Sequence, residues 1–555
     1  MVSQEKPIFW ADQIAKQAIE RAKKEKNIVT CRSGASPSGA KHIGNLFDVA
    51  KSWFVHKAVL KQGYQSRFVL TNDNRDPLRK IPDKLPGLDG KIHELTKEEK
   101  KKLEKHLGYS YVDVPDPFGC CKSWAEHFGR VWLDGILALG IEPEVYDNDS
   151  LYLQGKFDPY IRMVVENIDK VRKIMSRFQR KVDENYIPMF VKCEKCGKMT
   201  ATPVEIDLEN WIVKYECRDV VLSSKYKVKG CGHKGETSLD NVKLAWRFEW
   251  PAQWAIFNTT FEPFGKEHYE GSWQSGQVIA REIYGIEPPI SHVYEFLLIN
   301  GKKMSASIGN IYITQQMLEI LEPEVFLFFY TKKSKKQRDL DLKHINRLVN
   351  DFDLAERVYF GVEKVKNEKE KVNWIRMYES AVKQISDHLP VRIPYRLAGL
   401  IVNVYQNKLW DEEFVVDTSI ELMKRTSLGN IYKTIESEDK KCIYNRLLLV
   451  KNWIERFAPE MKITLNEKAP KLVVEDDEIK ALEKFSKILG EAESEDELYE
   501  KIYSICKDYE MKPQRFFSLL YKILIGKEQG PRLATFVFTV GKEKVKKLLD
   551  DALSR

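Results

Sequence analysis

The sequence predicts an α/β domain that is followed by an all-helical region. Near the start, a β-type run at 27–30, a loop of small residues, an apolar helix and a second strand at 66–71 follow one another. This order is typical of a right-handed βαβ unit with a parallel sheet. From about residue 313 onward the apolar residues keep a helical period and proline and glycine are sparse, which predicts a multi-helix module.

Length and composition narrow the class of protein. At 555 residues the chain exceeds the usual size of one domain, and 43% hydrophobic content is enough for sizeable cores. Its start has no long apolar run, and no stretch of about twenty apolar residues follows, so we expect neither a signal peptide nor a membrane span. Nine cysteines without a secretory signal favour a reducing cytoplasm. The net charge of +8, with acids and bases interspersed, permits a polyanionic partner but does not demand one.

The first loop carries the earliest functional pattern. An amphipathic helix is expected within 1–26, and the loop 31–45 follows the first strand. Its small residues let a ligand approach the backbone, and the start of the next helix offers free N–H groups to an anion. His42 and Asn45 can donate to the same anion. We therefore predict a phosphate site, although neither of the common Gly-rich phosphate motifs is present.

Acidic residues follow the second strand, and an inserted block follows them. Asp73 and Asp76 stand where ligands sit in parallel sheets, although acids at a strand end are often only turn residues. The block that continues to Phe178 is first loop-rich and then mostly helical. Its segment 113–121, which ends in two adjacent cysteines, shows no chemistry that the pattern explains.

A cysteine knuckle predicts a structural zinc site. Cys193 and Cys196 form a CxxC pair followed by glycine, a hairpin that aims two thiolates at one ion. Cys217 and Cys231 complete the preferred set, while His233 could replace Cys217. Free or disulfide-bonded cysteines are the alternative that this spacing disfavours.

A second candidate loop lies much further along the chain. It is preceded by three tryptophans at a spacing of four, 246, 250 and 254, for which core packing is the favoured role. After an apolar run, Lys303, Ser305 and Ser307 offer a charge and two hydroxyls that suit a triphosphate. An ordinary solvated basic loop is the alternative.

The two loops together resemble the HIGH and KMSKS signatures of class I aminoacyl-tRNA synthetases. Further segments resemble the archaeal-type class I lysyl-tRNA synthetases in particular, over nearly the whole chain. These segments are 33–39, 42–45, 76–82, 115–120, 244–251, 264–268, 293–296, 356–361 and the tail to Arg532.

The resemblance implies a domain organisation. Residues 1–315 would form a Rossmann-like catalytic domain, interrupted at about 75–240 by an insertion with the zinc knuckle at 190–236. A helical connecting domain would follow at 316–400, and an α-helical anticodon-binding region at 401–555.

The resemblance also implies roles for individual residues. His42, Asn45 and Lys303 would act in catalysis by holding phosphate charge. ATP would contact Pro37, Ser38, Gly39, His42, Gly44, Asn45, Lys303, Met304, Ser305 and Ser307. Lysine would contact Gly34, Ser36, Trp246, His268 and Tyr294.

The implied reaction attaches lysine to tRNA(Lys) through a lysyl-adenylate. Lysine, ATP with Mg²⁺, tRNA(Lys) and a structural Zn²⁺ would be the partners and cofactors, in the cytoplasm and without a membrane; a monomer is favoured. A class I synthetase for glutamate or cysteine, or a non-catalytic tRNA-binding paralogue, stays open as an alternative.

Some positions depart from the family pattern. Ala306 stands where many class I enzymes carry a second lysine, so charge on the pyrophosphate would come mainly from Lys303, with Lys302 as a second source. Arg32 replaces an acid that the amino-acid site would use. The lysine ammonium needs a carboxylate, for which Asp48, Glu249 and Glu295 are the candidates.

Overall fold

The chain forms two compact units. A computed structural model describes residues 9–554, except 224–225, 305–309, 333–336, 427–428, 430, 433 and 472. The first unit comprises Met1–Leu318, Pro323–Asp341 and Val365–Ile385, and the second comprises Glu319–Glu322, Leu342–Lys364 and Ser386–Arg555. The division into 1–315, 316–400 and 401–555 stays a prediction.

A five-stranded parallel sheet organises the first unit, in the order β14-β13-β1-β2-β5. The sequence therefore predicted the parallel βαβ unit correctly. From β1 the chain first adds β2 and β5 on one side of the sheet, and later adds β13 and β14 on the other side. In such sheets ligands bind at the carboxyl ends of the strands where this direction reverses. The strands are β1 Val29–Ala35, β2 Ser66–Asn72, β5 Glu144–Asp147, β13 Thr259–Gly265 and β14 Ile290–Tyr294.

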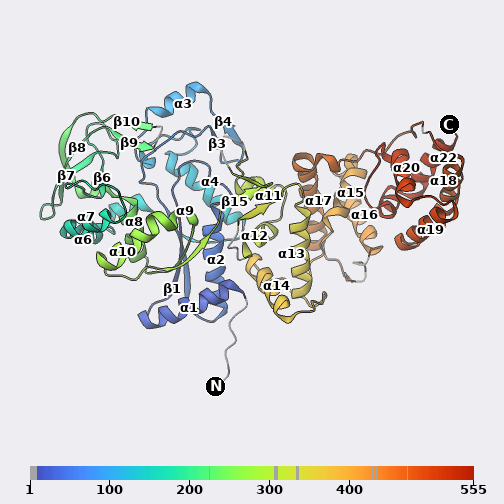
Figure 1. The fold of residues 1–555 in the computed structure, drawn as a ribbon, viewed down its shortest axis with the longest axis horizontal. Helices are drawn as coiled ribbons and strands as arrows, with labels where there is room; N and C mark the ends of the chain where they lie inside the picture. The colour runs from blue at the N-terminus through green and yellow to red at the C-terminus, as the bar shows by residue number, and fades with distance from the viewer. Residues whose placement is uncertain are drawn as a thin grey trace, which may run out of the picture. The chain divides into compact units, whose positions relative to one another are not determined.

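Strand β1 runs further than the sequence predicted. It continues through Ala35 because its residues pair in parallel with β2, up to Ala35 opposite Asn72. Gly34 is required at this close approach, since a Cβ atom there would lie 2.7 Å from Oγ1 of Thr71. The loop that follows leads into α2, Leu46–Lys61, which packs on β1 and β13 and against α1, Trp10–Glu25 (Figure 1). The beginning of α2 therefore lies over the carboxyl end of β1.

The range predicted as an insertion is only partly outside the sheet. Strand β5 lies within it and still pairs with β2. The remaining elements form small antiparallel sheets and helices (Figure 1). They are β3 Lys84–Pro86, β4 Ile92–Glu94, α3 Lys97–Glu104, α4 Trp124–Ala138, α5 Asn148–Leu153, α6 Asp158–Glu166, α7 Ile168–Ser176, β6 Met189–Val191, β7 Thr202–Asp207, β8 Ile212–Glu216, β9 Val220–Ser223, β10 Tyr226–Val228, β11 Lys234–Ser238 and β12 Val242–Leu244.

The second predicted loop begins on a short hairpin. The apolar run before this loop contains β15, Leu297–Ile299, which follows β14 and pairs antiparallel with β16, Lys302–Lys303. Ser305 and Ser307 lie outside the described residues. The first unit closes with α11 Thr314–Leu318, α12 Pro323–Thr331, β17 Arg338–Leu340 and α14 Glu368–Ala381.

The described part of the second unit is helical, as the periodicity after residue 313 predicted. Its helices bury apolar faces at a period of 3.6, for example Ile443, Leu447, Val450 and Ile454 on α17. Within the described residues, no helix combines the length and the apolar content that crossing a membrane requires. The helices are α13 Asn346–Tyr359, α15 Tyr395–Val404, α16 Glu412–Lys424, α17 Ser437–Phe457, α18 Asp476–Leu489, α19 Glu495–Asp508, α20 Pro513–Ile525, α21 Leu533–Val540 and α22 Lys542–Leu553.

Candidate active site

A cavity of about 410 Å³ opens at the carboxyl ends of the central strands. Its walls come from the end of β1, the segment after β2, the start of α2, the segment after β13, and the hairpin of β15 and β16. Most residues that the sequence predicted for ATP or lysine line this one cavity. They are Gly34, Ser36, His42, Gly44, Asn45, Trp246, His268, Tyr294, Lys303 and Met304.

Three predicted ATP contacts do not line the cavity. Pro37, Ser38 and Gly39 are absent from its wall, although the carbonyl of Pro37 accepts a hydrogen bond of 2.7 Å from the indole of Trp124 on α4. The bond connects the phosphate loop to a helix of the predicted insertion. Pro37 instead lines a smaller neighbouring cavity together with Ser36 and Lys41.

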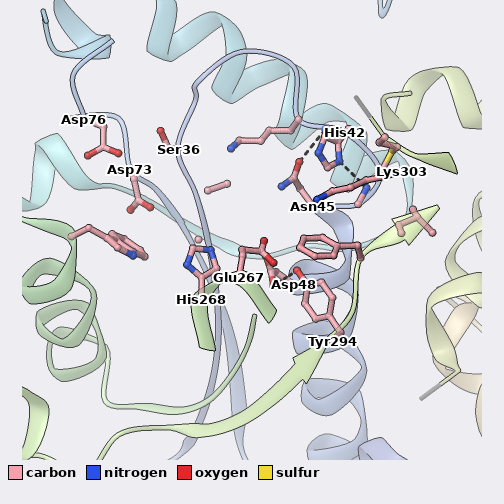
Figure 2. Close-up of a pocket in the computed structure, with 18 residues that line it drawn as sticks. Ser36, His42, Asn45, Asp48, Asp73, Asp76, Glu267, His268, Tyr294 and Lys303 are labelled. Atoms are coloured by element: carbon pink, nitrogen blue, oxygen red, sulfur yellow. Dashed lines mark hydrogen bonds between the residues drawn. The ribbon is translucent and has the colours of Figure 1, made fainter. Parts of the chain in front are cut away.

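His42, Asn45 and Lys303 gather at one end of the cavity, and Asp73 and Asp76 lie at the other (Figure 2). Burial, together with the charge of Lys41, lowers the pKa of His42 to about 4, so its ring is neutral at pH 7. Nδ1 of that ring accepts a 3.1 Å hydrogen bond from the backbone N–H of Gly44. The proton of the neutral ring must therefore sit on Nε2, which makes His42 a hydrogen-bond donor toward the cavity.

Asn45 stabilises the same turn. Its Oδ1 accepts a 3.1 Å bond from the backbone N–H of His42, which leaves its amide group as a donor. The turn is held further by Tyr330, whose hydroxyl donates to the carbonyl of Ile43 over 2.8 Å. Two side-chain donors thus stand beside the N-terminus of α2, whose free N–H groups favour an anion.

Lys303 contributes a cation from the opposite loop. Its Nζ lies 3.9 Å from the centre of the Phe296 ring, and the amide of Asn310 donates to its backbone carbonyl over 3.1 Å. Lys302 is exposed and does not line the cavity. Of these two lysines only Lys303 lines the cavity, and its role as the main cation of this loop stays a prediction.

Of the three acids proposed for an ammonium, Asp48 alone lines the cavity. The hydroxyl of Tyr294 donates a 2.7 Å hydrogen bond to Oδ1 of Asp48. Burial raises the pKa of Asp48 to about 8, because no described cation lies within ion-pair distance to offset the loss of water. Figure 2 shows Asp48 beside Tyr294, near Glu267 and His268. The part of the cavity beside Asp48 and Tyr294 suits a long cationic side chain.

The other two candidate acids serve the structure. Glu249 is fully buried and pairs with Lys243, whose Nζ also lies 2.8 Å from Asp76. Burial raises the pKa of Glu249 to about 7 even though Lys243 opposes that rise. Glu295 does not line the cavity and pairs with Lys266 at 2.8 Å.

Arg32 lies beneath the cavity rather than in its wall. Its guanidinium is fully buried and pairs with Glu262 at 2.5 Å and with Oγ1 of Thr71 at 2.7 Å. Glu262 also accepts bonds of 2.9 Å from the indoles of Trp250 and Trp254. Arg32 therefore anchors the helix that carries the tryptophans, α8 Trp246–Ile256, where Trp250 and Trp254 are core residues as predicted and Trp246 lines the cavity.

Four cysteine sulfurs converge in the insertion. Cys193, Cys196, Cys217 and Cys231 place their Sγ atoms within 4.8 Å of one another, and the pairs Cys193–Cys231 and Cys196–Cys217 are each 3.7 Å apart. Tetrahedral zinc with Zn–S bonds of about 2.3 Å separates its sulfurs by about 3.8 Å, so the group fits this ion. Gly197, with φ of 75°, closes the CxxC turn. His233 is not a member of the group.

A second potential metal group was missed by the sequence analysis. Asp116, Cys120, Cys121 and His127 also place one ligand atom each within 4.8 Å of the others. Nδ1 of His127 lies 3.3 Å from Sγ of Cys120 and 3.2 Å from a carboxylate oxygen of Asp116. The adjacent cysteines with an acid four residues earlier and a histidine six residues later were the available signal, but this spacing matches no familiar CxxC pattern.

The cavity lies between the two loops, at the carboxyl ends of the strands where the strand order reverses. This arrangement defines a class I synthetase catalytic domain. The family described as "tRNA synthetases class I (K)" matches residues 8–383, and the chain belongs to this family.

Curated relatives agree over almost their entire lengths. A "Lysine--tRNA ligase" of Natronomonas pharaonis is 36% identical over 95% of this chain and 94% of its own. A protein of the same name from Halobacterium salinarum is 33% identical over 97% of this chain and 96% of its own. Another from Pyrococcus horikoshii is 33% identical over 98% of this chain and 99% of its own.

Proposed function

We propose that this chain is a lysine–tRNA ligase that forms lysyl-adenylate from lysine and ATP and then transfers the lysyl group to tRNA(Lys). The observation that carries the proposal is the single cavity whose wall holds both the phosphate donors, His42, Asn45 and Lys303, and the carboxyl of Asp48, which has no described cation within ion-pair distance. Membership of the class I (K) family and full-length relatives of that name support it.

In the first step a lysine carboxylate oxygen attacks the α-phosphorus in line, and the bond to the leaving pyrophosphate breaks. Lysine supplies the nucleophile itself, so the protein contributes positioning and charge stabilisation. Nε2–H of His42 and the amide of Asn45 hold phosphate oxygens at the start of α2. Lys303 stabilises the negative charge that develops on the leaving pyrophosphate. The hydroxyls of Ser305 and Ser307, together with Met304 and Gly44, complete this ATP site in the proposal.

Lysine binding uses the part of the cavity wall formed by Asp48 and Tyr294. The ammonium pairs with Asp48, and Tyr294 holds that carboxyl in place through its hydroxyl. Trp246 and the ring of Tyr294 cover the apolar stem, while Gly34, Ser36 and His268 contact the amino-acid backbone. An ammonium that enters this site replaces lost water by a direct ion pair, which makes the carboxyl charge favourable again.

In the second step the terminal ribose of the tRNA takes the lysyl group from the adenylate, and AMP leaves. We assign tRNA recognition to the helical region at 401–555, and translation places the enzyme in the cytoplasm. Mg²⁺ enters with ATP, where it shields phosphate charge. The oligomeric state proposed is a monomer.

The two cysteine-containing groups are proposed as structural metal sites. Cys193, Cys196, Cys217 and Cys231 leave no open position at a tetrahedral zinc, so that ion would stabilise the insertion and not take part in chemistry. Metal analysis of protein purified without chelators should find zinc, and Cys196→Ser should lower both the metal content and the melting temperature. Asp116, Cys120, Cys121 and His127 offer a second site of mixed ligands; retention of all metal in a Cys121→Ser variant would contradict it.

Charging assays test the proposed activity directly. Purified protein, ATP and total tRNA are offered each of the twenty amino acids in turn, and acid-precipitable product is measured. Lysine alone should be attached. Attachment of glutamate or cysteine instead would assign another class I specificity, and no attachment at all would favour a tRNA-binding paralogue without catalysis.

A further inference from the structure

The cavity wall carries more acidic than basic side chains. Its wall contains the carboxyls of Asp48, Asp73, Asp76 and Glu267. Among the described residues of that wall, the lysines are Lys41 and Lys303. The ring of His42 is neutral, so it adds a donor but no charge. A triphosphate that entered this space with Lys303 as its one cation would meet a predominantly acidic surface.

Lys41 has no established role among the residues discussed above, yet it immediately precedes His42 in the phosphate loop. Within the described residues, its ammonium makes no ion pair within 4.0 Å and no hydrogen bond, although the side chain is only partly exposed. The nearby carboxyls are engaged elsewhere. Asp73 accepts 2.9 Å bonds from the amides of Asn148 and Gln253, and Asp76 pairs with Lys243 at 2.8 Å.

A cation without a partner on a cavity wall is a poor structural element, because its loss of water is not repaid by a close carboxylate. Burial accordingly lowers the pKa of Lys41, and the more distant charges of Asp73, Asp48 and Asp76 offset only part of that shift. An anionic ligand would supply the missing partner. Lys41 also lines a smaller neighbouring cavity of about 180 Å³, so its side chain stands at the boundary of two open spaces.

We propose that Lys41 is a second catalytic cation, which binds the α-phosphate of ATP while Lys303 follows the pyrophosphate. The proposal rests on the function proposed above and deepens it. Lys41 immediately precedes His42 in the phosphate loop and lines the same cavity as His42, Asp48 and Asp73. A phosphate held by His42 would therefore lie beside a cation that has no close partner of its own. Lys41 thereby offsets Ala306 in the second loop, where the chain lacks a lysine.

The test is lysine-dependent ATP–pyrophosphate exchange in the presence of tRNA. Lys41→Gln keeps donor groups but removes the charge, and should lower kcat/KM for ATP by about 10²-fold, the scale of one transition-state donor. The KM for lysine should change less than about twofold in the same variant. Lys41→Arg, which keeps the charge, should restore most of the activity. Lys80→Gln is the matched control, because Lys80 is an exposed lysine whose charge acts on Lys41 but which does not line the cavity.

Several outcomes would overturn the proposal. Unchanged ATP parameters in Lys41→Gln would exclude Lys41 from catalysis, and a defect confined to the KM for lysine would assign it to the amino acid. An equal loss in Lys80→Gln would mean that only the general charge of the surface matters. If Lys41→Gln does not fold, the double variant Lys41→Gln/Asp73→Asn removes one charge of each sign and is assayed instead. Failure of the wild-type protein to charge lysine would refute the proposed function and is visible before any variant is made.

Discussion

Two regions of the molecule bury charge in different ways. In the second unit, Arg446 is almost fully buried and makes a bidentate pair with Asp353 at 2.8 and 3.0 Å and a bond of 2.5 Å to Glu322. In the cavity of the first unit, Asp48 has the hydroxyl of Tyr294 and no described cation within ion-pair distance. In the second unit the buried ionisable groups pair with one another, whereas in the cavity Asp48 is available to pair with a cationic ligand.

The pKa values follow this difference. Burial opposes the charge of Glu322, yet Arg446 and Arg392 hold its pKa below the ordinary value. Burial instead raises the pKa of Asp48 to about 8. A buried charge with a close partner is explained by folding alone, whereas a buried charge without one is a candidate for ligand binding. Four experiments test whether the two regions differ in this way.

Discrimination against norleucine should show the largest effect. Norleucine keeps the apolar stem of lysine but has no ammonium, so it would leave Asp48 unpaired. Wild-type kcat/KM should be lower for norleucine than for lysine by about 10⁴-fold or more. Asp48→Asn should reduce that ratio sharply by impairing lysine. Glu295→Gln is the control, because Glu295 lies outside the cavity and its variant should discriminate normally. Equal use of both amino acids by the wild type would remove Asp48 from lysine recognition.

Removal of the cation at the phosphate end should come next. Lys303→Ala should lower the rate of adenylate formation by about 10²- to 10³-fold, since it removes one donor to the developing pyrophosphate charge. Its melting temperature should remain close to that of the wild type. Lys302→Ala, an exposed neighbour, should keep most of the activity. Near-normal pyrophosphate exchange in Lys303→Ala would exclude that lysine from the mechanism.

Substitution of Arg446, which pairs with Asp353 and Glu322, should change the stability of the protein and not its choice of amino acid. Arg446→Met leaves Asp353 and Glu322 buried without their cation and should cost about 3–5 kcal/mol of unfolding free energy. Lys440→Met, on the same helix but in an exposed pair with Asp417, should cost about 1 kcal/mol or less. Denaturant titration measures both values. Arg446→Met, as far as it remains folded, should keep the wild-type KM for lysine. A large change in that KM would mean that Arg446 and its two acids also act on the substrate.

The pH dependence of lysine binding should be the smallest effect. Because the pKa of Asp48 is raised to about 8, its carboxyl is mostly protonated and neutral below that pH, and charged above it. The lysine ammonium needs the charged form, so the KM for lysine should fall by about tenfold for each pH unit of increase below the pKa and then level off. Steady-state charging between pH 6.5 and 8.5 measures this. The Asp48→Asn variant should show no such slope, and a slope preserved in it would assign the titration to another group.

Local patterns determined much of what could be predicted. The order of strand, loop, helix and strand was sufficient for the parallel βαβ unit, because each element follows from its neighbours in sequence. The CxxC pair likewise identified two of the four converging sulfurs, since a short hairpin fixes their geometry by itself. The Asp116 group is equally local, but it was missed because its spacing carries no general rule.

The candidate phosphate donors could be read from short segments of the sequence, His42 to Asn45 and Lys303. The folded structure was needed to show which candidate acid lines the cavity, because Asp48 meets Tyr294 across 246 positions of chain, and Glu249 is paired with Lys243. It also decided that Arg32 is an anchor and not a ligand, through its pair with Glu262, 230 positions away. The physical reason is the same in each case: the partner that neutralises a buried charge comes from a distant strand or helix, and folding alone brings the two together.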